Sequence, residues 1–133
     1  MILTPVTAAS PVIQLHLLGA LIALGLGAVQ LALAKGTAPH RLLGYIWVGM
    51  MTVVALSSFF IFEMRLWGPF SPIHLLSAFT LASLYLAVRA ARNHQIKRHR
   101  VMMQALYVFA LVLTGAFTFL PGRLLHQLVM LNL

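Results

Sequence analysis

The sequence predicts an all-α integral membrane protein, a four-helix bundle whose transmembrane helices run up-down-up-down. Hydrophobic residues make up 62% of the 133 residues and charged residues only 8%, whereas a soluble domain carries about 25% charged residues. Four stretches are long enough to cross a hydrocarbon layer of about 30 Å. The segments between them are short, and short connections place consecutive helices side by side and antiparallel. We therefore expect one domain, residues 1–133, whose surroundings are the lipid bilayer.

The predicted spans begin at recognisable signals. Ser10-Pro11 and Ser71-Pro72 each have the pattern of a capping serine followed by proline at the first helical position. The first ten residues contain no Lys or Arg, unlike the positive start of a cleaved signal peptide, so we expect the first span to be retained. The predicted spans are residues 12–34, 42–62, 73–91 and 101–120, and an interfacial segment covers residues 123–133.

Positive charge divides unevenly between the two ends of this bundle. Two connections on one side hold seven of the nine Lys and Arg residues, and the other side holds Arg65 and Arg123, with Glu63 nearby. Because cytoplasmic loops are enriched in Lys and Arg, we expect both basic loops on the cytoplasmic side of a bacterial inner membrane. Both termini are then expected on the outer side. Trp67 would mark the outer interface. The seven residues are Lys35, Arg41, Arg89, Arg92, Lys97, Arg98 and Arg100.

The net charge of +8 points to a polyanionic partner, either nucleic acid or anionic lipid. The basic residues flank the predicted spans rather than following one groove-sized face. This distribution favours lipid and argues against nucleic acid.

Two histidine motifs each occur twice at nearly the same offset. His16 is followed by two leucines and two small residues, and so is His74, 58 residues later. His40-Arg41 is matched by His99-Arg100, 59 residues later. The chain therefore has the pattern of one helical hairpin repeated, with one histidine pair near each membrane face.

Two imidazoles on opposing helices are what a six-coordinate haem iron needs as axial ligands. If a pseudo-two-fold axis along the membrane normal relates the halves, the first and third spans face each other diagonally, as do the second and fourth. We expect haem b, in one or two copies, with one pair of histidines on each. Arginines beside the inner histidines would hold propionates. The predicted cofactor-binding residues are His16, His74, His40, His99, Arg41 and Arg100, and the first four are the predicted metal ligands.

Ordinary structural roles remain open for the same residues. An interfacial histidine can bond to a backbone carbonyl or a headgroup, and the inner pair could be polar helix-start residues. Glycines such as Gly19 and Gly27 could serve close helix packing rather than porphyrin contact. His94 and His126 have no counterpart in the other half and are expected in a loop and in the tail.

The histidine placement resembles that of di-haem b-type cytochromes of the b561 kind, in which haems lie between the first and third and between the second and fourth core helices. In extended sequence, the chain resembles an uncharacterised bacterial membrane-protein family, domain of unknown function 2306. The segments that carry this resemblance are Ile13 to Ala20 (IQLHLLGA), Gly36 to Tyr45 (GTAPHRLLGY), Ser71 to Leu75 (SPIHL) and Arg98 to Arg100 (RHR). That family implies no established activity.

Composition limits the chemistry. There is no cysteine, which excludes disulfides, thiolate-bound zinc and iron–sulfur clusters. With one acidic residue and no hydrolytic or phosphate-binding motif, nothing supports hydrolysis or phosphoryl transfer. The leading interpretation is an electron-transfer protein that passes electrons across or within the membrane, between a quinol or a periplasmic partner and an acceptor. Two alternatives stay open: a non-catalytic accessory subunit of a larger respiratory or photosynthetic membrane complex, and a small transporter or channel.

Overall fold

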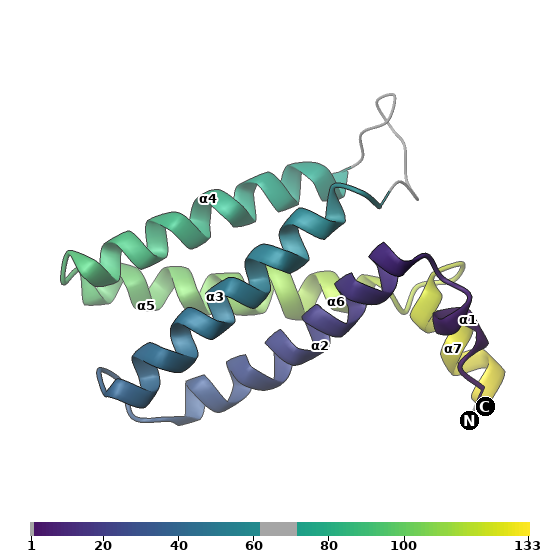
Figure 1. Cartoon of the computed structure of the whole chain (residues 1–133), viewed down its shortest axis with the longest axis horizontal. Helices are drawn as coiled ribbons and strands as arrows, with labels where there is room; N and C mark the ends of the chain where they lie inside the picture. The colour runs from purple at the N-terminus through teal and green to yellow at the C-terminus, as the bar shows by residue number, and fades with distance from the viewer. Residues whose placement is uncertain (1, 62–71) are drawn as a thin grey trace.

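Four long helices, each antiparallel to the next, form the body of the protein (Figure 1). The computed structural model describes residues 2–61 and 72–133, and it contains no β-strand in these ranges. The fourth long helix is continuous and comprises α5, η1 and α6. The elements are α1 (Thr4–Thr7), α2 (Pro11–Ala32), α3 (Ala38–Ser58), α4 (Pro72–Arg92), α5 (Ile96–Ala105), η1 (Leu106–Leu113), α6 (Thr114–Phe117) and α7 (Leu124–Asn132).

Four helices in the described ranges are long and apolar enough to span a membrane: Pro11–Ala32, Ala38–Ser58, His74–Arg92 and Ile96–Phe117. The predicted all-α membrane fold is therefore confirmed. The fourth helix begins at Ile96 rather than near residue 101. Its first turns carry Lys and Arg, which lower hydropathy but are good helix formers. The predictions for Glu63, Arg65 and Trp67 lie outside the described residues.

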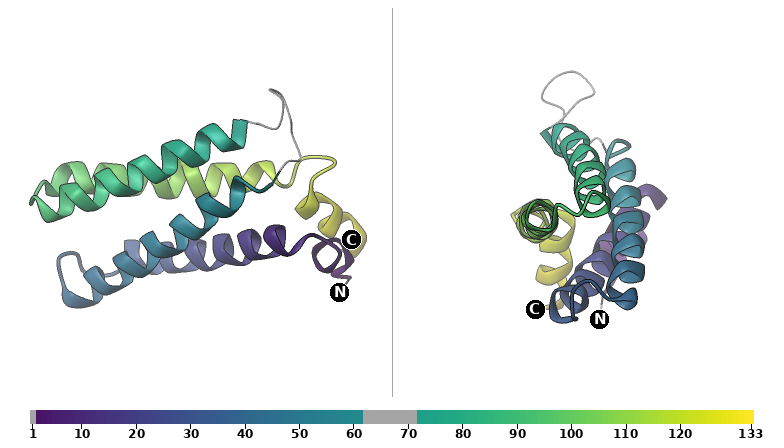
Figure 2. Two further views of the ribbon diagram at one scale, coloured as in Figure 1. Left: turned by 45° about the horizontal axis from the view of Figure 1, so that its top comes forward. Right: turned by 90° about the vertical axis from the view of Figure 1, so that its left-hand side faces the viewer.

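The long helices form a ring of neighbours. α2 packs on α3, α3 on α4, and α4 on α5, while η1 contacts both α2 and α4 and so closes the ring. The end-on view in Figure 2 shows the same order. α2 and α4 therefore lie on opposite sides of the bundle, separated by α3 on one side and by η1 on the other.

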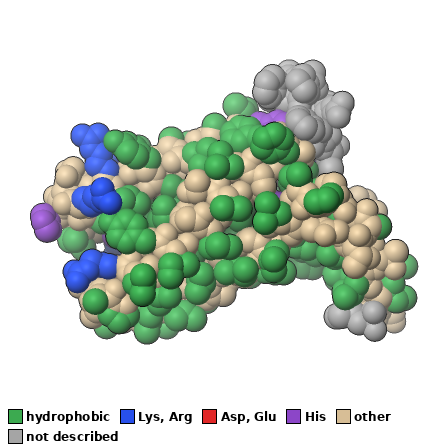
Figure 3. Space-filling model, in the orientation of Figure 1, with side chains coloured by type: hydrophobic (Ala, Val, Ile, Leu, Met, Phe, Trp, Pro, Cys, Tyr) green, Lys and Arg blue, Asp and Glu red, His purple; other side chains and the backbone are tan. Residues whose placement is uncertain are grey.

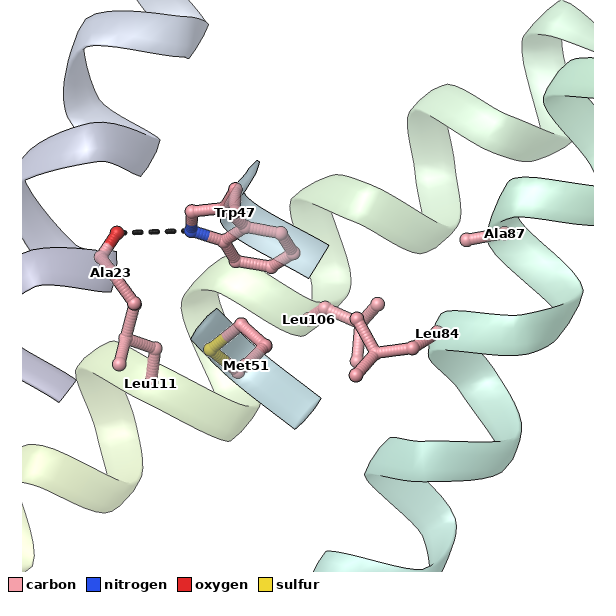
Figure 4. Packing of buried hydrophobic residues seen from close by; sticks show 7 residues of the cluster. All are labelled: Ala23, Trp47, Met51, Leu84, Ala87, Leu106 and Leu111. Atoms are coloured by element: carbon pink, nitrogen blue, oxygen red, sulfur yellow. Dashed lines mark hydrogen bonds between the residues drawn. The ribbon is translucent and has the colours of Figure 1, made fainter. Parts of the chain in front are cut away.

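Large apolar side chains fill the middle of the bundle (Figure 4). Trp47 is 3% exposed, and its indole Nε1 donates a hydrogen bond to the carbonyl of Ala23 at 2.9 Å. This bond satisfies a polar group that would be costly to leave unpaired in lipid. Met51 and Leu84 pack in the same cluster. The core thus joins all four long helices.

Gly27 lets η1 approach α2 closely. A Cβ built on Gly27 would lie 2.3 Å from Cε2 of Tyr107 and 3.0 Å from Nε1 of Trp47. The Tyr107 ring is also held in place, because its hydroxyl donates to the carbonyl of Leu24 at 2.9 Å. Only a residue without a side chain fits at this crossing.

Replacing Gly27 with alanine is expected to destabilise the protein, because the new methyl group would meet the Tyr107 ring. Overpacking of this kind costs about 1–3 kcal/mol, against a helix-propensity gain of up to about 1 kcal/mol. Gly25→Ala is the matched control, since nothing lies within 4 Å of a Cβ built there. Thermal unfolding in detergent should give a lower midpoint for Gly27→Ala than for Gly25→Ala. Equal midpoints would show that this contact does not stabilise the bundle.

Both chain termini lie at one end of the bundle, which we call the terminal end (Figure 1). The side chain of Asn132 accepts from the backbone N–H of Ile2 at 2.6 Å and donates to the carbonyl of Ile2 at 2.8 Å. These two bonds tie α7 to the start of the chain. The opposite end carries the α2–α3 and α4–α5 turns, and we call it the basic end.

Candidate functional site at the terminal end

His16 lies in the second turn of α2 and is fixed by α3. Its Nδ1 is 2.9 Å from the carbonyl oxygen of Val54 and 3.0 Å from Oγ of Ser57. A carbonyl can only accept, so Nδ1 carries the hydrogen and, in the neutral ring, Nε2 carries the lone pair. Metal-ligating histidines show this arrangement, because the bond at one nitrogen orients the ring for the other. The same contact is also what the structural alternative predicts, namely a histidine bonded to a backbone carbonyl.

His74 lies in the first turn of α4 and is 5% exposed. Its ring stacks on that of Phe59, with centroids 5.7 Å apart and planes 2° from parallel. His74, Ser77 and Thr80 form a buried polar stripe along one face of α4. Ser77 Oγ is hydrogen-bonded to Ser58 Oγ on α3. Polar side chains therefore hold α3 against α4 at the terminal end, as hydrogen bonds do between helices in lipid.

A cavity of about 420 Å³ opens beside His16, within the range of small-molecule sites. α2, α3, α4 and the fourth long helix all contribute to its mainly apolar wall. His74 is not part of the wall and lies one turn before the lining residue Ser77. The cavity therefore reaches one of the two terminal-end histidines directly. Its polar lining residues are His16, Ser58, Ser77, Thr80, Thr114 and Thr118.

The fourth long helix is wound as a π-helix over η1, where it borders this cavity. A π-helix is rare, and it occurs often at functional sites because it widens the helix. Thr114 Oγ1, just after η1, donates to the carbonyl of Phe109 at 2.8 Å. The sequence does not reveal this feature, since residues 106–113 contain no proline or charge that would mark it.

At the basic end, His99 and His40 are bonded in opposite ways. Nδ1 of His99 is 2.9 Å from the carbonyl oxygen of Ala87, so it donates and leaves the lone pair on Nε2. Nδ1 of His40 faces Nε2 of Gln30 at 2.9 Å, and the same amide nitrogen donates to the carbonyl of His40 at 2.6 Å. Turning the amide over would set two acceptors against each other. Nδ1 of His40 therefore accepts, and its Nε2 carries the hydrogen.

His40 and His99 lie in the first turns of α3 and α5 at the basic end. However, a nitrogen that carries a hydrogen has no lone pair for a metal, so this pair is not arranged as two matching ligands. Gln30 causes this difference, and it is not part of the repeated histidine motifs. Its signal was an amide side chain near the end of an apolar span.

Four candidate residues remain to be placed. Arg41 and Arg100 are exposed at the basic end, and their role with propionates remains a prediction. His94 has a φ of 59° and closes the turn after α4. Nδ1 of His126 is 3.1 Å from the carbonyl oxygen of Phe119.

Some glycines would make room for a porphyrin if haem were bound. Where these glycines are enclosed, they lie against other helices. A Cβ on Gly19 would lie 3.0 Å from Cγ2 of Val54, and the space at Gly27 is taken by Tyr107. This supports close helix packing as their role. Among residues 2–61 and 72–133, no three His, Cys, Asp or Glu side chains gather as a metal site.

Comparison with known proteins places the chain in one group. A family model described as "Predicted membrane protein (DUF2306)" matches residues 13–130. No curated protein and no solved structure matches the chain.

Proposed function

The chain belongs to the DUF2306 family of predicted membrane proteins, and we propose that within the membrane it binds one b-type haem at the terminal end and carries electrons. The observation that carries the proposal is the bonding of His16. Nδ1 donates to the carbonyl of Val54 and to Ser57, which leaves Nε2 with a lone pair on a residue that lines a cavity. A bundle of four helices commonly holds its cofactor by side chains on facing helices.

The chemistry of the surrounding residues fits a haem in part. The wall is mainly apolar, as a porphyrin face requires, and its polar side chains come from several helices. Only His16 lines the cavity, whereas His74 on the opposite helix is stacked on Phe59. His74 is proposed as the second ligand, and it would have to leave that stack to bind iron.

The protein's own part in the proposed function is to hold and tune the group. A haem supplies one-electron chemistry, which the side chains of this protein do not. The hydrogen bonds from Nδ1 of His16 fix the ring and raise the basicity of Nε2. The mainly apolar wall lowers the polarity around a bound metal, which influences its potential.

We propose one haem rather than two, because His16 at the terminal end and His40 at the basic end carry the hydrogen on different ring nitrogens. At the basic end, Nε2 of His40 carries a hydrogen as long as Gln30 donates to Nδ1. A haem there would require Nε2 of His40 to lose its hydrogen, whereas at the terminal end Nε2 of His16 already has a lone pair and only the ring of His74 would have to move.

The proposal is tested on protein purified from haem-replete cells in mild detergent. Absorption spectra of the oxidised and dithionite-reduced protein should show a b-type Soret band and a sharp α band on reduction. The ratio of haem to chain should be close to one. Protein without stoichiometric haem would count against the proposal.

A further inference from the structure

The basic end carries positive charge for which the chain offers little compensation. Its one acidic residue, Glu63, precedes α4 in the sequence, whereas five Lys and Arg residues lie near or after the other end of α4. Figure 3 shows Lys and Arg side chains gathered at the left-hand end of the molecule, where the α4–α5 turn lies. Exposed Lys and Arg residues next to a membrane attract anionic lipid headgroups.

Some of these cations are already used by the protein. Nζ of Lys35 donates to three carbonyls at the end of α2, at 2.7–2.8 Å. Arg92 donates from Nε to the hydroxyl of Tyr45 at 3.2 Å. In contrast, the side chains of Lys97 and Arg98 are exposed and make no hydrogen bond or ion pair with another residue that the structure describes.

Lys97 and Arg98 border an open hollow of about 710 Å³ at the α4–α5 turn, and His94 lies on its rim. The turn is well defined: Gln95 N–H donates to the carbonyl of Ala90 at 2.8 Å, and His94 N–H donates to that of Ala91 at 3.1 Å. This is the bonding of a Schellman motif, which closes a helix end. The remaining side chains of the hollow include the apolar residues Ile96, Val101 and Met102.

We propose that this hollow binds the headgroup of an anionic glycerophospholipid, with Lys97 and Arg98 on its phosphate. The guanidinium suits this role, because it can form two parallel hydrogen bonds to a phosphate. Lys97 and Arg98 lie in the first turn of the candidate span Ile96–Phe117, before its apolar stretch begins at Val101, so we expect the hollow at the membrane interface. Ile96 and Val101 then contact the glycerol and upper acyl region. A free phosphate ion would pair the cations but would leave this apolar surface bare.

Lipid titration followed by native mass spectrometry tests the proposal. Delipidated protein in detergent is titrated with phosphatidylglycerol, or with phosphatidylcholine of the same acyl chains. We expect preferential binding of phosphatidylglycerol. The double variant Lys97→Gln/Arg98→Gln should weaken it about 25-fold, at roughly fivefold for each cation near a membrane surface. Circular dichroism checks that the variant is folded.

The matched control removes the same charge from the other basic loop. Lys35→Gln/Arg41→Gln should change phosphatidylglycerol binding less than about twofold, because neither residue borders the hollow. An equal loss in both double variants would overturn the proposal in favour of charge spread over the whole end. Displacement of the lipid by millimolar inorganic phosphate, without preference for phosphatidylglycerol, would overturn it in favour of a free-anion site.

Discussion

His16→Ala is expected to abolish haem binding by the purified protein, with a loss of at least about tenfold in haem per chain. Alanine removes the oriented imidazole of the one histidine that lines the terminal-end cavity. The bonds to Val54 and Ser57 cannot be replaced by a methyl group. The haem content is measured from the reduced-minus-oxidised spectrum against protein concentration.

The control is His126→Ala at the same end of the molecule. His126 also bonds to a backbone carbonyl, that of Phe119, but it is not part of the cavity wall. This variant should keep its haem. Free imidazole should restore haem binding to His16→Ala, because it can occupy the space of the lost ring and supply the same nitrogen. Loss of haem without rescue, in a variant that unfolds at a lower temperature, would assign His16 a purely structural role.

Trp47→Ala is expected to have the largest effect on stability. The indole is 3% exposed, lies at the centre of the core cluster, and bonds to the carbonyl of Ala23. Truncating a buried Trp costs about 3–5 kcal/mol in soluble proteins, mainly through the cavity left behind. Lost packing is also costly in a membrane, where close contact is a main source of helix association. The unfolding midpoint in detergent should fall by about 10 °C or more.

Phe79→Ala provides the comparison for Trp47→Ala. Phe79 is another large aromatic residue in a membrane-spanning helix, but it is 69% exposed and faces away from the core. Its truncation should shift the midpoint by no more than about 3 °C, since little packing is lost. Similar shifts for the two variants would mean that the core around Trp47 does not hold the four helices together.

The membrane-spanning helices could be predicted because hydropathy and helix-start residues act locally. Ser10 accepts from the N–H of Ile13 in the structure, as the capping pattern indicated. The first residues of the helices could not be predicted from hydropathy in the same way. α3 begins at Ala38 because Thr37 caps it through the N–H of His40, and both residues precede the apolar stretch. A hydropathy pattern does not include such polar first turns.

The candidate site could be predicted only in outline. Sequence placed His16 and His74 near one end of the bundle, but it could not show that one ring bonds to α3 and the other stacks on Phe59. These contacts depend on how the helices are rotated, and the repeat alone does not specify rotation. The contact of Gln30 with His40 is of the same kind, since it joins two helices across a turn. The repeat thus indicated equivalent histidines, and packing made them different.

The central claim is most directly tested by counting haem per chain together with the spectrum of the His40→Ala variant. Wild-type protein is predicted to hold one reducible b-type haem, and His40→Ala is predicted to hold the same amount, because the terminal-end cavity does not include His40. Wild-type protein without haem, or protein that loses its haem in His40→Ala and keeps it in His16→Ala, would contradict this account.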